Sequence, residues 1–248
     1  MIKQRLIWLA LIVLIAATLA CDAPFDVGTI QGSGNVVTEE REVSDFDKVA
    51  MSGFGRVIVT QGDSESLTIE TDDNLMQYIE TQVSGGTLEL GFTDDVERKI
   101  LDPSDSIIFR LGVIDLSALN ISGAGSFEVK ELGADRFELV LSGAGDVKID
   151  SLAATDLVVT VSGAGGIEMA GQVETQAVTL SGFGSYDAPD LESQDATVQV
   201  GGAGSATVWA HDTLDIEIGG AGDVDYFGSP DVTQDISGAG SITSQGDK

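Results

Sequence analysis

A short glycine-rich unit recurs along the chain and constrains its fold more than any other feature. The unit reads [S/G]-G-[A/F]-G, and from Ser122 onward the steps between successive starts are 20, 20, 19, 20, 18 and 18 residues. A fixed period in this range is typical of solenoids, in which each repeat forms one layer of a stack. The units contain most of the 31 glycines, so the glycine excess belongs to a recurring backbone turn. The eight units start at Ser52, Ser122, Ser142, Ser162, Ser181, Gly201, Gly219 and Ser237.

Apolar residues flank each unit with a spacing of two. Around Ser142 they are Leu139 and Leu141 before the unit and Val147 and Ile149 after it. This alternation predicts two short strands with one buried face, joined by the glycine corner. A further inward side chain is expected ten residues after the start of a unit, where Leu132, Leu152 and Leu191 stand.

Such a strand pair cannot bury its apolar face alone, but stacked copies share one core. We therefore predict an all-β fold over residues 34–248, a single-stranded parallel β-helix (β-solenoid) with about 20 residues per coil. Glycine at the corner is explained either by a positive φ or by close approach of the backbone.

Two segments interrupt the period. Between Ser52 and Ser122 we expect less regular first coils, with a helical turn at 74–80 and an exposed loop at 94–106. Residues 226–230 are expected to form the cap that a solenoid needs over its last coil.

The amino terminus has the pattern of an export signal. Lys3 and Arg5 precede an uncharged apolar run, Leu6 to Ala20, that is shorter than the roughly 20 residues of a membrane span. Cys21 follows a small residue and resembles the lipidated cysteine of a bacterial lipoprotein. We predict a signal peptide at 1–20, lipidation of Cys21 and a short tether at 21–33. The alternative is an ordinary secretory signal with Cys21 incidental.

The charge balance excludes several classes of function. The chain has 41 acidic and 12 basic side chains and a net charge of −29, which excludes nucleic-acid binding through a basic face. Loss of residues 1–20 would remove two positive charges and no acid. We therefore expect the protein to be attached to the membrane only through lipid on Cys21. This attachment places it outside the cytoplasm, on the cell membrane or the outer membrane.

Several segments together resemble one bacterial family. They are Ser52–Gly55, the run 73–75 leading to 78–81, the segment 86–88, the serial Ser-Gly-Ala-Gly units and Gly228-Ser229-Pro230. In these the chain resembles, over roughly residues 46–245, the family called putative auto-transporter adhesin head, or GIN domain. The resemblance implies an exported, often lipid-anchored right-handed β-helix of largely unassigned function. It transfers no catalytic or binding residue.

Candidate chemistry is sparse. Trp209 is a candidate sugar-stacking platform, with a partly exposed outward residue as the simpler interpretation. His211 stands ten residues after Gly201, so it is interpreted first as a corner residue half packed on the solenoid, and one His with one Cys gives little basis for a metal site. The segment 219–223 begins like a calcium-binding nonapeptide, but the sixth position is the inward Val224 rather than Asp. The glycine units lack the lysine and the following helix of a phosphate-binding loop.

These observations predict a non-enzymatic cell-envelope lipoprotein, a structural, adhesive or binding β-solenoid that presents an acidic surface to an envelope protein or glycan. No catalytic residue, metal or cofactor is expected. The alternative is a carbohydrate-active β-helix enzyme, a polysaccharide lyase or hydrolase, which needs carboxylates and bases clustered at one groove. After Ser122 the acids are spread coil by coil. The only bases there are Lys130, Arg136, Lys148 and Lys248.

Overall fold

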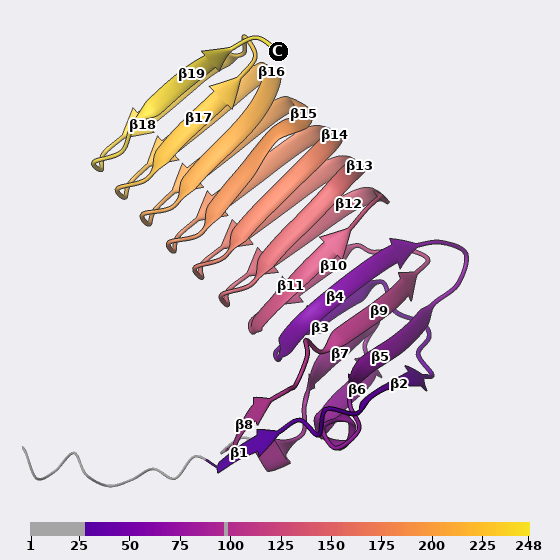
Figure 1. Ribbon diagram of the computed structural model, residues 1–248. Coiled ribbons are helices and arrows are strands. Elements are labelled where there is room, and N and C mark those ends of the chain that lie inside the picture. The colour runs from indigo at the N-terminus through magenta and orange to yellow at the C-terminus, as the bar shows by residue number, and fades with distance from the viewer. Residues whose placement is uncertain (1–27, 97–98) are drawn as a thin grey trace, which may run out of the picture.

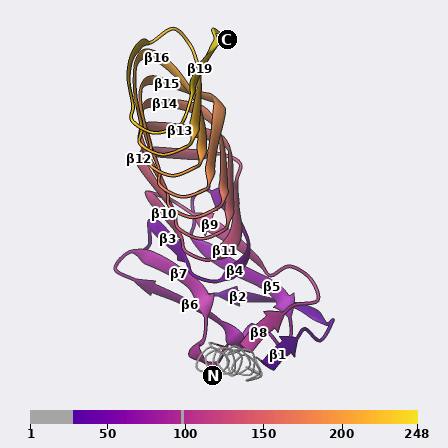
Figure 2. The same cartoon turned by 90° about the vertical axis from the view of Figure 1, so that its left-hand side faces the viewer.

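The protein is a rod of stacked coils built on a broader base. The computed structural model describes residues 28–96 and 99–248, so the predicted signal peptide and Cys21 lie outside the described residues. The base holds the N-terminal elements, and the coils climb from it to β19 at the opposite end (Figure 1). Viewed along another direction, the coils form closed loops around a common interior (Figure 2). In the described part, no helix has the length and apolar character to cross a membrane.

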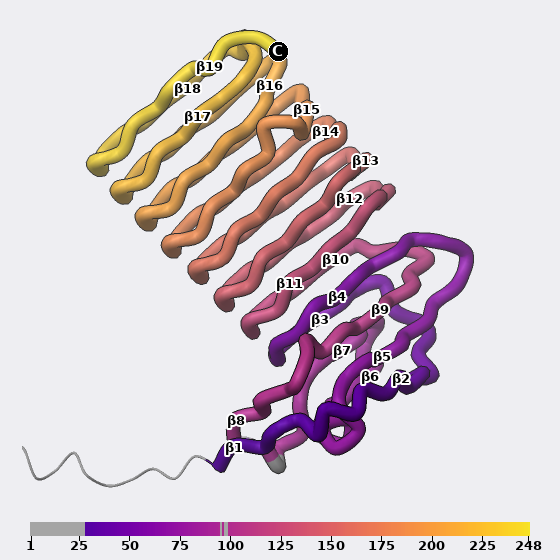
Figure 3. The backbone as a smooth tube through the Cα atoms, viewed as in Figure 1, coloured from indigo at the N-terminus to yellow at the C-terminus, as the bar shows by residue number. Residues whose placement is uncertain are grey.

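The stack confirms the predicted parallel β-helix. Paired strands of successive coils are parallel and in register over most of their length, with Leu139 beside Val159 and Val147 beside Ile167. The tube in Figure 3 shows the strands running across the rod rather than along it. The strands of the stack are β3 (Lys48–Met51), β4 (Phe54–Gln61), β10 (Ala118–Ile121), β11 (Ala124–Val129), β12 (Leu132–Leu141), β13 (Asp146–Val161), β14 (Gly166–Leu180), β15 (Ser185–Val200), β16 (Ser205–Ile218), β17 (Asp223–Phe227), β18 (Asp231–Ile236) and β19 (Ile242–Gly246).

The predicted inward residues form the core. The pairs on both sides of the glycine units are buried from the coil of Ser52 to that of Gly201, and Leu132, Leu152 and Leu191 are buried as well. Apolar burial of this kind stabilises by about 25 cal/mol per Å². Each coil therefore depends on its two neighbours for most of its stability.

The glycine corners stack in one column, and close approach of the backbone explains their composition. A Cβ added at the second residue of the unit, at Gly123, Gly143 or Gly163, would lie 1.7–1.9 Å from a carbonyl oxygen of the coil below. Among the glycines of the eight repeated units, Gly55 alone has a positive φ, 140°. The same approach permits a hydrogen-bond ladder: the N–H of Ala144 donates to the Gly123 carbonyl at 3.1 Å, and the next coils repeat the bond.

The base extends the first coil downward on both of its faces, and it confirms the less regular first coils. On one face β4 pairs with β9 (Ile108–Val113), which continues through antiparallel β5 (Ser66–Asp72) to β2 (Val36–Arg41). On the other face β3 pairs with β7 (Thr87–Phe92), which pairs with antiparallel β6 (Ile79–Ser84).

Two local predictions for the base need correction or refinement. The segment 94–106 is not simply a loop: it holds a 3₁₀ turn, η2 (Asp94–Val96), and strand β8 (Lys99–Asp102). Strand β8 pairs in parallel with β1 (Gly28–Gln31), inside the range assigned to the tether. The turn expected at 74–80 is the 3₁₀ helix η1 (Met76–Tyr78), which leads directly into β6.

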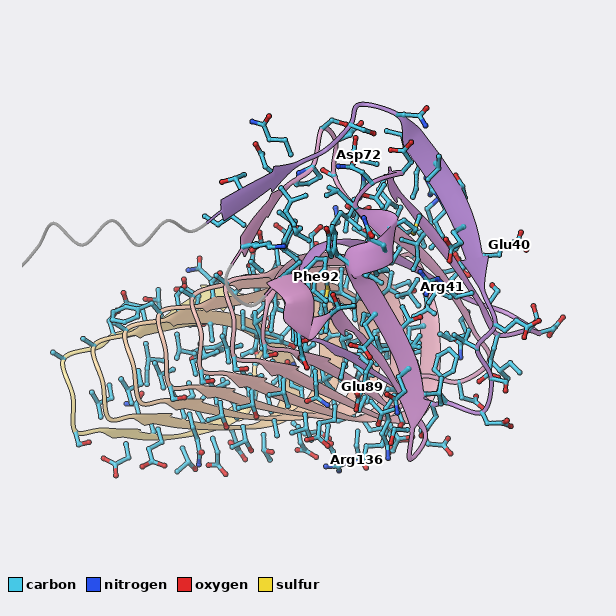
Figure 4. All side chains as sticks on the ribbon, turned by 90° about the horizontal axis from the view of Figure 1, so that it is seen from below. Glu40, Arg41, Asp72, Glu89, Phe92 and Arg136 are labelled. Atoms are coloured by element: carbon cyan, nitrogen blue, oxygen red, sulfur yellow. The ribbon has the colours of Figure 1, made fainter. Side chains whose placement is uncertain are left out.

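Asp72 lies in the base (Figure 4) and ties three of its segments together. Its side chain is buried and accepts hydrogen bonds from the Ser104 hydroxyl at 2.6 Å, the Ser104 N–H at 2.8 Å and the Gly34 N–H at 2.7 Å. The Ser104 hydroxyl, with help from the two N–H groups, lowers the pKa of Asp72 because each donor favours the ionised carboxylate. The N-terminal segment is thus fixed to the base by a carboxylate that stays charged.

The cap predicted at 226–230 is wrong. Those residues end β17 and form the next corner, and the coil made by β18 and β19 follows them. All six residues of β18 are exposed, including Val232 and Ile236. Val232 and Ile236 are exposed because no described segment lies above them, whereas Ile242 of β19 is half-buried against the core.

Replacing a second-position glycine should disrupt the stack. We expect Gly163→Ala to destabilise the fold by about 3 kcal/mol or more, because its Cβ would meet the Gly143 carbonyl oxygen at 1.8 Å. Gly201→Ala is the matched control: its Cβ would meet nothing closer than 4.0 Å, and most other coils have serine there. Urea unfolding of both variants measures the difference, and equal midpoints would contradict the close-approach explanation.

Candidate functional site

Near the far end of the rod, one corner gathers aromatic and charged side chains from three successive coils and Lys248, which follows β19. It lies where β15, β16 and β17 turn, on the side away from the glycine column. Trp209 and Phe227 occupy paired positions on neighbouring coils, and Glu192 pairs with Trp209 on the other side. We call the set the aromatic corner: Asp190, Glu192, Trp209, His211, Phe227 and Lys248.

Strand alternation points the aromatic rings outward. Val208 and Ala210, on either side of Trp209, are buried, whereas Trp209 is half-buried. Because paired residues of parallel in-register strands project to the same side, Phe227 and Trp209 form one outward column. Phe227 is also half-buried. The column offers two adjacent aromatic faces to a ligand.

His211 and Glu192 border this column. The Nε2 of His211 lies 2.8 Å from Oε1 of Glu192, and its ring centre lies 5.5 Å from that of Trp209, inclined by 50°. Both side chains remain more than one-third exposed. The imidazole of this pair thus lies next to the indole at the exposed border of the column.

Lys248 contacts the other side of the column. Its Nζ lies 4.7 Å from the centre of the Phe227 ring and 5.5 Å from that of the Trp209 ring, within the range of cation–π attraction. The same ammonium donates to the Pro189 carbonyl at 2.8 Å and forms an ion pair with Asp190. One ammonium thus has two aromatic faces, a carbonyl and a carboxylate as partners.

A buried polar network holds the backbone beneath Trp209. The Ser193 hydroxyl donates to the Trp209 carbonyl at 2.8 Å, and Nε2 of Gln176 donates to the same oxygen at 3.3 Å and to the Ser193 Oγ at 2.8 Å. The Tyr186 hydroxyl donates to Oε1 of Gln176 at 3.0 Å. Burial raises the pKa of Tyr186, so its hydroxyl keeps the proton that it donates. The indole therefore projects from a fixed backbone position.

The structure places the two candidate ligand residues from the sequence, Trp209 and His211, close together, but His211 does not occupy the position that the repeat predicted. Trp209 faces outward, in the position expected for a stacking platform. His211 does not take the inward place of Leu191, because the coil that starts at Gly201 is shorter and the register between β15 and β16 shifts before it. Its side chain is exposed instead, and Ala210 is the buried residue at this corner.

Four members of the site were missed by sequence reasoning. Phe227 carries a usable signal, since it stands eight residues after Gly219 as Trp209 does after Gly201. Asp190 and Glu192 have no such signal among many outward acids. Lys248 could have been singled out because it is the one lysine or arginine after Lys148. Its position beside the aromatic rings could not be predicted from the sequence.

The irregular base borders a concave surface. A groove of about 580 Å³ runs between residues 103–107 and the first glycine corners, and Arg56 and Asp146 are among its lining residues. Arg56 Nη2 contacts Glu128 Oε2 at 2.6 Å, and this hydrogen bond raises the pKa of Arg56 and lowers the pKa of Glu128. The cation of the groove is therefore already paired within the protein.

Hydrogen bonds shift the pKa values of three carboxylates in the same direction. Donors lower the pKa of Asp72, Asp73 and Glu128 and hold these carboxylates ionised. Within 28–96 and 99–248, no group of three or more His, Cys, Asp or Glu side chains is arranged to hold a metal ion.

The stacked parallel coils define the chain as a β-solenoid repeat protein with an outward aromatic column. Comparison with known proteins identifies its family. The family model "Putative auto-transporter adhesin, head GIN domain" matches residues 45–230. The chain belongs to this family. Membership implies an exported protein with an adhesive or binding role. No curated protein matches the sequence.

Solved structures share the fold along most of the rod. A putative adhesin from Bacteroides fragilis NCTC 9343 is 25% identical with a TM-score of 0.82, and the alignment covers 87% of this chain and 99% of that one. A putative lipid binding protein from Parabacteroides distasonis ATCC 8503 is 26% identical with a TM-score of 0.69, at the same two coverages. A putative adhesin from Parabacteroides merdae ATCC 43184, 19% identical with a TM-score of 0.64, covers 88% of this chain and 99% of its own.

Removing the Tyr186 hydroxyl tests the buried network. We expect Tyr186→Phe to destabilise by about 1–3 kcal/mol, because Oε1 of Gln176 loses its donor in the core. Adding Gln176→Met should restore part of that loss, since the unsatisfied oxygen is then gone while Ser193 still donates to Trp209. Urea unfolding of the single and double variants measures both effects. Fully additive losses would show that the two side chains act independently.

Proposed function

We propose that this protein is a lipid-anchored cell-envelope binding module that presents the aromatic corner to a partner at a fixed distance from the membrane. The observation that carries the proposal is the outward column of Trp209 and Phe227, fixed from within by the Ser193 and Gln176 hydrogen bonds. Aromatic faces held on rigid elements are typical anchors of binding surfaces.

The direction of the rod supports this role. The described chain enters at the base, and the coils carry the aromatic corner toward the opposite end (Figure 1). The corner on β16 lies five coil steps above the first corner, or roughly 24 Å at ~4.8 Å per step. An anchor near the N-terminus therefore leaves the corner pointing away from the bilayer.

The surface charge favours the same arrangement. From Asp150 to Asp247 the sequence has no lysine or arginine, so the upper coils are acidic throughout. Such a surface is repelled by anionic lipid headgroups and resists association between copies. A membrane link through lipid on Cys21 is compatible with this charge, whereas adsorption of the rod to the bilayer is not.

The anchor can be tested directly. We expect the mature wild-type protein to partition into the detergent phase of a phase-separating extract and Cys21→Ser to move to the aqueous phase, because several acyl chains hold a protein firmly and none remain in the variant. Mass spectrometry of the N-terminal peptide identifies the lipid. An unmodified N-terminus on an aqueous-phase wild-type protein would contradict the anchor.

Site-specific photo-crosslinking on intact cells tests the binding role. A photoreactive residue in place of the exposed Asp212, beside the corner, should capture a discrete partner, and adding Trp209→Ala should abolish that product. The matched control places the same photoreactive residue at Glu138, an exposed position nearer the base. Identical products at both positions, or no Trp209-dependent product, would overturn the proposal.

A further inference from the structure

The contacts of Lys248 identify the chemistry that the aromatic corner accepts. Its ammonium lies over the Phe227 and Trp209 rings, donates to the Pro189 carbonyl and pairs with Asp190. These groups attract a cation in different ways: the ring faces by their quadrupoles, the carbonyl by a hydrogen bond and the carboxylate by charge. All of them converge on one atom, Nζ.

We propose that the aromatic corner is an ammonium-binding site that receives a lysine side chain of a partner protein in the place now taken by Lys248. This inference rests on the proposed binding role and adds the chemical class of the group bound. A neutral sugar could stack on Trp209, but it would leave the Asp190 carboxylate and the Pro189 carbonyl without the cation they now hold.

The neighbourhood favours a lysine carried by a basic segment. Glu192 belongs to the corner and Asp212 directly follows its His211, and no lysine or arginine stands between Asp150 and Asp247 to repel an incoming cation. Long-range electrostatic attraction therefore directs basic chains to the upper coils. The aromatic rings and the Pro189 carbonyl then bind a lysine ammonium specifically, which a general charge attraction would not do. The fixed Trp209 backbone reduces the ordering cost of binding.

Lys248 acts as a competitor within the same chain. A partner lysine can bind only in the fraction of molecules whose corner is open, so the apparent dissociation constant is the intrinsic one divided by that fraction. The side chain of Lys248 is 27% exposed and its partner Asp190 is 72% exposed, so the internal ion pair is accessible to exchange. Removing the lysine should strengthen binding of a partner, whereas a purely structural ion pair predicts no such gain.

Titration of the mature, lipid-bearing protein in detergent tests the assignment. Trp209 is the single tryptophan after the predicted signal peptide and therefore serves as the indole reporter. The probes are the peptide acetyl-Gly-Ser-Lys-Ser-Gly-amide, its Nε-acetyl-lysine twin and a tetramer of glucosamine. We expect the lysine peptide to change Trp209 emission, the acetylated twin to have no effect, and Lys248→Gln to tighten the peptide about tenfold.

Variants distinguish binding at a specific ammonium site from attraction to the acidic surface as a whole. By calorimetry, Asp190→Asn and Phe227→Ala in the Lys248→Gln background should each weaken the peptide about tenfold. Asp235→Asn, with the same charge change on exposed β18, should bind as its parent does. Equal binding of the two peptides, or equal weakening by Asp190→Asn and Asp235→Asn, would overturn the ammonium site.

The remaining outcomes distinguish this inference from the function beneath it. Binding of the glucosamine tetramer as tightly as the lysine peptide would overturn the assignment to a protein partner. If none of the probes binds while the photoreactive residue at position 212 still captures a Trp209-dependent partner in cells, the ammonium assignment fails and the binding role stands. If no Trp209-dependent partner is captured in cells while the lysine peptide still changes Trp209 emission, the cellular role is refuted and the ammonium site stands.

Discussion

Contact between backbones at the glycine corner is the constraint on which the rest of the structure depends. The carbonyl of one corner occupies the space that a Cβ of the next would need, as at Gly143 and Gly163. This contact sets the coil spacing and aligns the N–H and C=O groups of the corner ladder. Only with that spacing do the apolar pairs on both strands lie directly above one another and exclude water. A conformational preference for positive φ would explain a turn, but it would not impose a distance.

Much of the stack could be predicted because its rules are local and repeated. Apolar residues alternate with a period of two within each strand, and the strands recur with a period near 20. Together these periods predict which side of each strand is buried, and Leu139, Val159 and Val178 are buried as predicted. The base could not be predicted in the same way, since the pairing of β1 with β8 joins segments about 70 residues apart that share no pattern. The expected cap failed because a Tyr-Phe-Gly-Ser-Pro sequence is equally suited to a corner that another coil follows.

The aromatic corner was predictable only in part for a related reason. Trp209 could be recognised as outward from its strand, but the place of His211 depended on a register shift that a fixed offset cannot anticipate. The shift occurs beside the buried Gln176 and Ser193, whose hydrogen bonds hold the Trp209 carbonyl in a core that is otherwise apolar. Buried polar groups are tolerated here because they satisfy one another. The buried polar groups on β14 and β15 thus lie directly behind the exposed site on β16.

The orientation of the strands also determines how the rod responds to force. Because the strands run across the long axis, a pull along that axis stretches the hydrogen bonds between coils and loads them one layer at a time (Figure 3). Each layer that peels away frees about 20 residues, a slack of roughly 66 Å at ~3.3 Å per residue. A molecule held at its base and pulled near its tip would thus lengthen in discrete steps. Each step would dissipate work before the full tension reached the bonds at the two points of attachment.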